Sequence, residues 1–230
     1  MTKEVPYYCD NDDNNIIRLF IIRHGQTEHN VKKILQGHKD TSINPTGEEQ
    51  ATKLGHYLRS RGIHFDKVVS SDLKRCRQTT ALVLKHSKQE NVPTSYTSGL
   101  RERYMGVIEG MQITEAEKYA DKHGEGSFRN FGEKSDDFVA RLTGCVEEEV
   151  AEASNEGVKN LALVSHGGAI RMILQWLKYE NHQAHKIIVF NTSVTIVDYV
   201  KDSKQFIVRR VGNTQHLGDG EFVVSDLRLR

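Results

Sequence analysis

Two apolar runs, far apart in the chain, each lead into a histidine that is followed by glycine. Leu19 to Ile22 precedes Arg23-His24-Gly25, and Leu161 to Val164 precedes Ser165-His166-Gly167. Unalternated apolar runs of this length are typical of strands buried on both faces of a parallel sheet. Because ligands bind beyond the carboxyl ends of such strands, we expect both imidazoles to meet in one crevice.

Helix signals lie between these runs and a third one, Lys67 to Ser70. The expected features are a helix from Asn44-Pro45 to Gly62, a helix capped by Asp72, a capping box of Thr114 and Glu117, a long helix from Ser135, a helix over Ala169 to Leu177, and a hairpin of Ser193 to Val200 with Gln205 to Val211. Alternating strands and helices predict a three-layer α/β/α sandwich whose mostly parallel central sheet carries an antiparallel edge hairpin.

The length and charge of the chain bound its organisation and partners. With 230 residues and 37% hydrophobic content, we expect one domain over 16–230, preceded by a disordered polar tail over 1–15. Lys and Arg total 32 against 31 for Asp and Glu, which argues against nucleic acid or a membrane surface as partner. No apolar run is long enough to cross a membrane or form a secretory signal, and the three cysteines show no metal or disulfide spacing. These features predict a cytoplasmic protein, with a nuclear location and homo-oligomerisation left open.

Several further motifs follow the first histidine in a fixed order. They are Gln26-Thr27-Glu28-His29-Asn30, Gln36-Gly37-His38-Lys39-Asp40, Asn44-Pro45-Thr46-Gly47, Ser70-Ser71-Asp72-Leu73-Lys74-Arg75, Leu100-Arg101-Glu102-Arg103, and Val164-Ser165-His166-Gly167-Gly168. In that order, these segments resemble the histidine phosphatase superfamily, the cofactor-dependent phosphoglycerate mutase-like group. The resemblance spans roughly Arg18 to Leu217 and implies a phosphoglycerate mutase-like fold.

Phosphoryl transfer needs positive charge around a dianionic phosphate, and the motifs contain suitable groups. Arg23, Arg75 and His166 are the expected cations, because each follows a predicted strand and guanidinium groups match phosphate oxygens in bidentate fashion. Gly25 and Gly167 are expected to let backbone N–H groups approach the phosphate.

Two side chains have the chemistry for bond making and proton transfer. His24 is the expected nucleophile, because an imidazole is neutral above a pKa of about 6.5 and nearby cations favour that form. The resemblance implies the same covalent role for His24. It also implies that Glu102 is the acid and base that protonates the leaving group and then activates water.

The resemblance implies weaker assignments for three further residues. They are a phosphate contact for Asn30 and supporting roles for Arg171 and His216. Read from the residues alone, Asn30 can instead cap a turn, while Arg171 and His216 can be ordinary surface groups.

The motifs predict catalysis without a metal or a cofactor. Neither a His-Glu-x-x-His pattern nor a carboxylate cluster for two ions occurs, and no phosphate-binding loop of nucleotide-driven kinases is present.

The first hypothesis is a phosphatase that acts on small phosphorylated metabolites through a phosphohistidine, most similar to the broad-specificity phosphatase branch. The second is a phosphoglycerate mutase. Resembling mutases carry a longer insertion after a Glu-Arg-His-Tyr-Gly pattern, which here reads Glu102-Arg103-Tyr104-Met105-Gly106. The third is an inert module that binds phosphorylated ligands.

Overall fold

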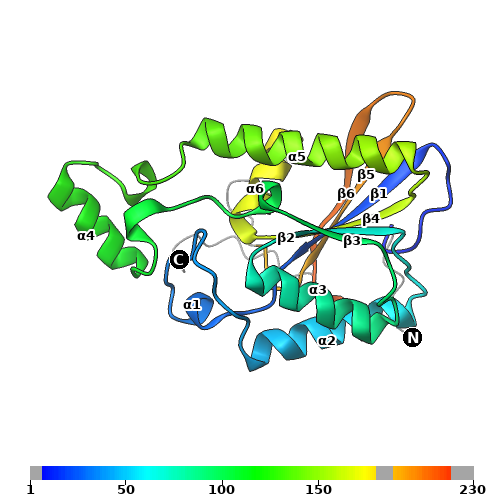
Figure 1. Cartoon of the computed structure of the whole chain (residues 1–230), viewed down its shortest axis with the longest axis horizontal. Helices are drawn as coiled ribbons and strands as arrows, with labels where there is room; N and C mark the ends of the chain where they lie inside the picture. The colour runs from blue at the N-terminus through cyan, green and yellow to red at the C-terminus, as the bar shows by residue number, and fades with distance from the viewer. Residues whose placement is uncertain (1–6, 180–188, 219–230) are drawn as a thin grey trace.

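The fold was analysed in a computed structural model that describes residues 7–179 and 189–218 (Figure 1). The strands are β1 (Ile16–Arg23), β2 (Lys67–Ser71), β3 (Thr94–Thr97), β4 (Asn160–Ser165), β5 (Val194–Val200) and β6 (Gln205–Asn213). The helices are α1 (Glu28–Val31), α2 (Pro45–Ser60), α3 (Lys74–Ser87), α4 (Ile113–His123), α5 (Ser135–Asn155) and α6 (Gly167–Trp176). Short 3-10 turns lie at Ser98–Leu100, Gly106–Ile108, Phe128–Asn130 and Gln215–Leu217.

One six-stranded sheet in the order β3-β2-β4-β1-β5-β6 forms the centre of the molecule. The first four strands of that order are mutually parallel, whereas β5 runs antiparallel to β1, and β6 antiparallel to β5. The carboxyl ends of β1 and β4 are level, because Arg23 is paired with Ser165. The residues that follow these two strands therefore start from adjacent points on one edge of the sheet.

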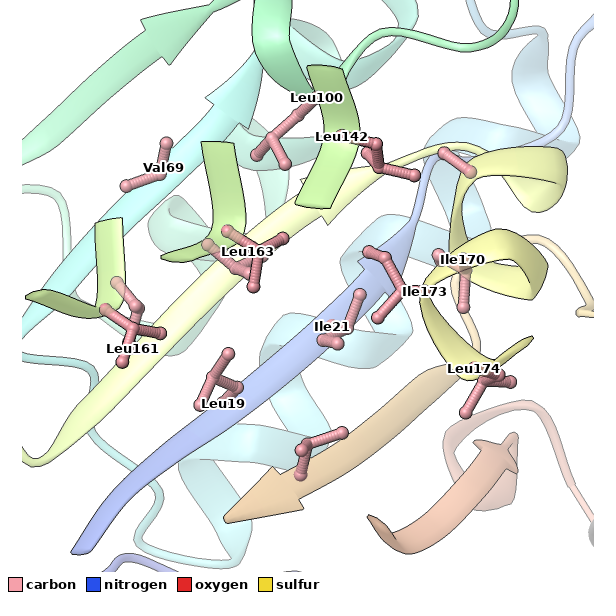
Figure 2. Packing of buried hydrophobic residues seen from close by; sticks show 14 of the residues in the cluster. Leu19, Ile21, Val69, Leu100, Leu142, Leu161, Leu163, Ile170, Ile173 and Leu174 are labelled. Carbon is pink, nitrogen blue, oxygen red and sulfur yellow. The ribbon is translucent and has the colours of Figure 1, made fainter. Parts of the chain in front are cut away.

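Side chains of the central strands alternate between two hydrophobic layers. Leu19 and Ile21 of β1 face the layer under α5 and α6, where Leu142 and Ile173 meet them (Figure 2). Phe20 and Ile22 of the same strand face the opposite layer, against α2 and α3. In Figure 1, α5 lies above the sheet and α2 and α3 lie below it. This alternation confirms the predicted α/β/α sandwich, since a strand buried on both faces must present apolar groups to both sides.

The edges of the sheet differ from the sequence prediction in two places. The hairpin of β5 and β6 forms as expected, but only β6 is an edge strand, because β5 lies between β1 and β6. The other edge strand, β3, was not predicted, since Thr94–Thr97 is short, polar and partly exposed.

Two predicted helix caps are also wrong. Asp72 does not cap α3, whose N-cap is Leu73, because the Asp72 carboxylate is held by two hydrogen bonds of 2.6 Å from Arg101. Thr114 forms no capping box, because α4 already begins at Ile113, with Gln112 as its N-cap. In both places the start of the helix is set by other contacts of the chain.

Residues 101–134 form a small separate layer beside the sheet, which is called the cap here. It contains α4, which projects from the sheet on the left of Figure 1. Ile108, Ala116, Ala120 and Phe128 form the buried core of the cap. The cap is therefore packed by its own few side chains and by Leu35 rather than by the sheet.

The N-terminal segment packs against the domain from residue 7 onward. Tyr8 is fully buried against Phe20 and Tyr57, and the backbone N–H of Asn11 donates to Asn160 at 2.7 Å. The expected disordered tail over 1–15 is therefore wrong from residue 7 onward, because the buried Tyr8 supplies apolar area that holds this segment on the domain. Residues 1–6 lie outside the described residues.

Within the described ranges, none of the helices combines the length and apolarity that crossing a bilayer requires.

Candidate active site

His24 and His166 meet at the carboxyl edge of the sheet, as the sequence predicted. His24 follows β1, His166 follows β4, and the backbone N–H of His24 donates to the carbonyl of Ser165 at 3.0 Å. The centroids of the two imidazole rings are 5.2 Å apart. Both side chains are almost fully buried, so they form one compact site.

The tautomer of His24 is determined by its own backbone surroundings. Its Nδ1 lies 2.7 Å from the carbonyl oxygen of Gly25, and because a carbonyl can only accept, Nδ1 carries the proton and donates it. Burial, followed by the charges of Arg75 and Arg23, holds the pKa of His24 well below its usual value. The Nε2 atom therefore keeps a lone pair at neutral pH and is available for attack.

His166 differs from its expected role as a cation. Its Nδ1 accepts a hydrogen bond of 3.1 Å from Nε of Arg75, and its Nε2 lies 2.8 Å from Oγ of Ser71. Burial and then the charge of Arg75 hold the pKa of His166 well below its usual value. His166 is thus neutral, and the positive charge of the site comes from the arginines.

Arg75 is the buried cation of the site and is held in place by backbone carbonyls. It lies in the first turn of α3 with 1% of its surface exposed. Its two terminal nitrogens each donate at 2.8 Å, one to the carbonyl of Lys39 and the other to that of Gly37. Neutral acceptors leave the full charge of the guanidinium to act on a neighbouring anion.

Glu102 reaches the same edge of the sheet from the loop after β3. One carboxylate oxygen accepts from the backbone N–H of Gly168 at 2.8 Å, and the other accepts from that of Arg103 at 3.0 Å. A Cβ atom on Gly168 would lie 2.3 Å from Oε1 of Glu102, so only glycine allows this close approach. Because Gly168 lies in the first turn of α6, two residues after His166, Glu102 is placed beside the histidine pair.

The glycines and Arg23 have roles that differ in part from those expected. The backbone N–H of Gly25 donates to Thr79 at 2.9 Å, so it does not face a phosphate as expected. Gly25 is needed for packing, because a Cβ there would lie 2.6 Å from the carbonyl oxygen of Gly47. Gly167 leaves room for Arg23, whose Nε would be 3.2 Å from an added Cβ. Arg23 itself donates to the carbonyl of Val189.

Asn30 forms a capping box at the start of α1, which was the structural alternative for this residue. Its Oδ1 accepts from the backbone N–H of Thr27 at 3.1 Å and from the side-chain amide of Asn191 at 3.3 Å. Because Oδ1 faces these donors, Nδ2 points the other way. Capping and a phosphate contact through Nδ2 are therefore compatible.

His216 is connected to the segment that carries His24 through Thr192. Its Nε2 lies 2.9 Å from Oγ1 of Thr192, whose backbone N–H donates to the carbonyl of Arg23 at 3.0 Å. Burial lowers the pKa of His216 to about 3, so its ring is neutral. This buried brace is consistent with the supporting role that the resemblance implied, and it excludes a solvated loop position.

Arg141 was missed by the sequence reading although it connects the Glu102 loop to α5. Its guanidinium donates to the carbonyls of Gly99 at 2.9 Å and Glu102 at 3.3 Å, and both carboxylate oxygens of Glu133 accept from it at 2.8 and 2.9 Å. In the sequence, Arg141 looks like any charged residue on the exposed face of a helix. Only the folded loop reveals that it holds the segment that carries Glu102.

The arrangement supplies a neutral nucleophile, a buried cation and a carboxylate at one edge. That combination suits transfer of a phosphoryl group: attack by an imidazole nitrogen, compensation of charge on the phosphate oxygens, and proton transfer to the leaving oxygen.

Comparison with known proteins gives the same picture at the level of the family. Residues 19–213 match the model of the histidine phosphatase superfamily (branch 1). A probable phosphatase of Schizosaccharomyces pombe is 34% identical over 213 residues, which cover 89% of this chain and 97% of that protein. A phosphoglycerate mutase-like protein of Arabidopsis thaliana is 27% identical over 94% of both chains.

Solved structures with the same fold include both phosphatases and mutases. The phosphoglycerate mutase of Bacillus anthracis superimposes with a TM-score of 0.78 at 28% identity, covering 88% of this chain and 96% of that one. A putative alpha-ribazole-5'-P phosphatase of Escherichia coli superimposes with a TM-score of 0.70 at 26% identity, covering 86% and 98%.

Proposed function

Because this chain belongs to the histidine phosphatase superfamily, we propose that it hydrolyses small phosphomonoesters through a phosphohistidine formed on His24. The observation that carries the proposal is the state of His24, a buried neutral imidazole whose Nδ1 donates to Gly25, which leaves Nε2 as nucleophile. Its ring centroid lies 5.2 Å from that of His166.

The reaction has two steps in this proposal. Nε2 of His24 attacks phosphorus, the bond from phosphorus to the ester oxygen breaks, and protonated Glu102 gives its proton to that oxygen. Water then attacks the phosphohistidine, Glu102 takes the proton from the water, and inorganic phosphate leaves with His24 restored. Arg75 and Arg23 stabilise the charge on the transferred group in both steps.

The substrates and the setting of the reaction also belong to the proposal. They are small phosphorylated metabolites in the cytoplasm, hydrolysed without a metal ion or a cofactor. An assay in the presence of a chelator tests the metal independence.

Phosphoglycerate mutase is the second candidate, favoured by the likeness to the Bacillus anthracis enzyme. The two activities share the phosphohistidine and differ in whether water or a second substrate hydroxyl accepts the phosphoryl group. Release of inorganic phosphate from 3-phosphoglycerate, compared with formation of 2-phosphoglycerate in the presence of a bisphosphate, separates them.

Rapid quenching after mixing with a radioactive phosphomonoester tests the covalent step. We expect a label on His24 that is stable in base and labile in acid, and that is absent from His24→Ala. His64→Ala is the matched control, because His64 is exposed and precedes β2, at the opposite edge of the sheet. Absence of label from the wild-type protein would remove the phosphatase and the mutase together and leave the inert binding module.

A further inference from the structure

Arg171 is a guanidinium close to Glu102 that the proposed reaction does not use. It lies on α6, three residues after Gly168, so both face the same side of the helix. Gly168 is the residue whose N–H holds the Glu102 carboxylate. Arg171 is also close enough for the charge of Glu102 to act on it, so it belongs to the surroundings of the proposed acid.

The Nη1 atom of Arg171 is shielded from solvent and has no hydrogen-bond partner among residues 7–179 and 189–218. Burial lowers the pKa of Arg171, and only the negative charge of Glu102 opposes that shift. A buried polar atom without a hydrogen-bond partner is costly, and in a native protein such an atom calls for an explanation, for which a bound anion is one candidate.

The surroundings of Arg171 carry more positive than negative charge. Both oxygens of Glu102 accept from backbone N–H groups. Arg103 donates to the backbone carbonyls of Glu133, Arg129 and Phe131 rather than to a carboxylate. Arg129 adds a third cation, because its charge acts on both Arg103 and Arg171. The charges that act on Arg171 are thus one carboxylate, Glu102, and one further guanidinium, Arg129. The other nearby carboxylate, Glu133, is already paired with Arg141. This balance leaves Arg171 able to attract an incoming anion.

We infer that Arg171 forms a second anion-binding subsite, which binds a carboxylate or a second phosphate on the leaving group of the substrate. The inference rests on the proposed function, because the leaving group is placed beside Glu102. It narrows the substrates to phosphomonoesters that carry another acidic group. A guanidinium suits either anion, since its planar fork can donate two parallel hydrogen bonds.

Matched substrate pairs test this subsite. 3-Phosphoglycerate and glycerol 3-phosphate differ in one group, a carboxylate against a hydroxymethyl. The bisphosphate and monophosphate of propane-1,3-diol differ in a second phosphate. We expect Arg171→Gln to lower kcat/KM by about 10- to 100-fold for the member of at least one pair that carries the second acidic group. For the member that lacks this group, we expect kcat/KM to fall by less than about 3-fold. The pair that responds identifies the anion.

Two further variants separate recognition from folding. Arg171→Lys keeps the charge without the fork, so we expect part of the preference for the acidic substrate to return. Lys118→Gln removes an exposed cation of α4 and should leave the ratio within each pair unchanged. Equal losses by Arg171→Gln on both members of both pairs would overturn the inference, because Arg171 would then act through Glu102 or through stability.

Calorimetry can measure how tightly each member of the two substrate pairs binds to the His24→Ala variant. This measurement does not depend on turnover. We expect this variant to bind an acidic member more tightly than its neutral partner, and the added Arg171→Gln change to abolish the difference. If that preference is found while the wild-type protein forms no phosphohistidine, the subsite stands and the proposed reaction fails. Equal affinity for both members of each pair overturns the subsite, whatever the wild-type activity.

Discussion

The two ends of the crevice are built in different ways. At the phosphate end, His24, His166 and Arg75 are 3%, 1% and 1% exposed. The two histidines directly follow strands of the sheet, and Arg75 is held by backbone carbonyls of Gly37 and Lys39. At the leaving-group end, Glu102 is only half-buried, and the cap exposes 45% of Tyr104 and 65% of Val107. The cap core has only four buried residues.

This difference separates chemistry from recognition. The phosphate end is as rigid as the sheet, because moving either histidine requires moving β1 or β4. The leaving-group end depends on a few side-chain hydrogen bonds, such as those of Arg141, and on a small core. Changes at the phosphate end should therefore affect all substrates equally, whereas changes at the leaving-group end should depend on the substrate.

The largest effect is expected from His24→Ala. Loss of the nucleophile should lower kcat/KM by about 10³-fold or more for every phosphomonoester, whatever its leaving group. Steady-state rates with p-nitrophenyl phosphate and with an alkyl phosphate measure this. A loss confined to one of the two substrates would contradict the assignment of His24 to the phosphate end.

Glu102→Gln should produce the opposite pattern. An alkoxide needs a proton to leave and p-nitrophenolate does not, so kcat should fall by about 10²- to 10⁴-fold for alkyl phosphates and by less than about 10-fold for p-nitrophenyl phosphate. The ratio of the two rates is the measurement. Equal losses would count against Glu102 as the acid.

Gly168→Ala should have a smaller effect on activity than Glu102→Gln, because it moves the Glu102 carboxylate without removing it. The new Cβ would overlap Oε1 of Glu102 and push the flexible side chain away from the N–H of residue 168. We expect kcat for alkyl phosphates to fall by about 10-fold, since small errors in position are costly in catalysis.

Gly144→Ala is the matched control for Gly168→Ala. It lies in α5, with nothing within 4 Å of an added Cβ. It should keep full activity and raise stability by about 1 kcal/mol. If Gly168→Ala were as active as this control, Glu102 would not depend on its contact with α6.

The smallest effect concerns the pH dependence of stability and comes from the buried histidines of the phosphate end. The unfolded chain protonates a histidine near pH 6.5, about its ordinary pKa, whereas folded His216 stays neutral down to about pH 3. Unfolding therefore takes up a proton in this window, so stability falls as pH falls, by at most about 1.4 kcal/mol per pH unit for each such group. The buried His24 and His166 act in the same direction.

His216→Gln should flatten this pH dependence by about one proton while changing activity at pH 7 only a few-fold. Urea unfolding between pH 7 and pH 4.5 measures the slope. Gln keeps a polar group for Thr192, which limits the loss of packing. An unchanged slope would mean that His216 is already protonated in the folded protein at these pH values.

Much of the phosphate end could be predicted because its signals are local. The apolar runs before His24 and His166 indicate strands, and adjacency in a parallel sheet brings their ends together. The sequence could not show that His166 is neutral, because this depends on Arg75 and on burial contributed by α3. It could not show that the N–H of Gly25 is used by Thr79 either.

Less of the leaving-group end could be predicted, because its contacts join segments with no shared pattern. Gly168 and Glu102 are 66 positions apart, and Arg141 and Glu102 are 39 apart. Edge strand β3, which carries the chain toward Glu102, is too short and polar to be recognised.

The sequence by itself determined the layered fold and the family, since strand burial and motif order are written in consecutive residues, and it supplied the residues that we propose as the reacting groups. Only the tertiary structure decided which nitrogen of His24 is held by Gly25, how Glu102 is held and that a buried nitrogen of Arg171 has no partner among residues 7–179 and 189–218. Those properties depend on distances between groups brought together by packing, and hydrogen bonds and desolvation act only over such distances.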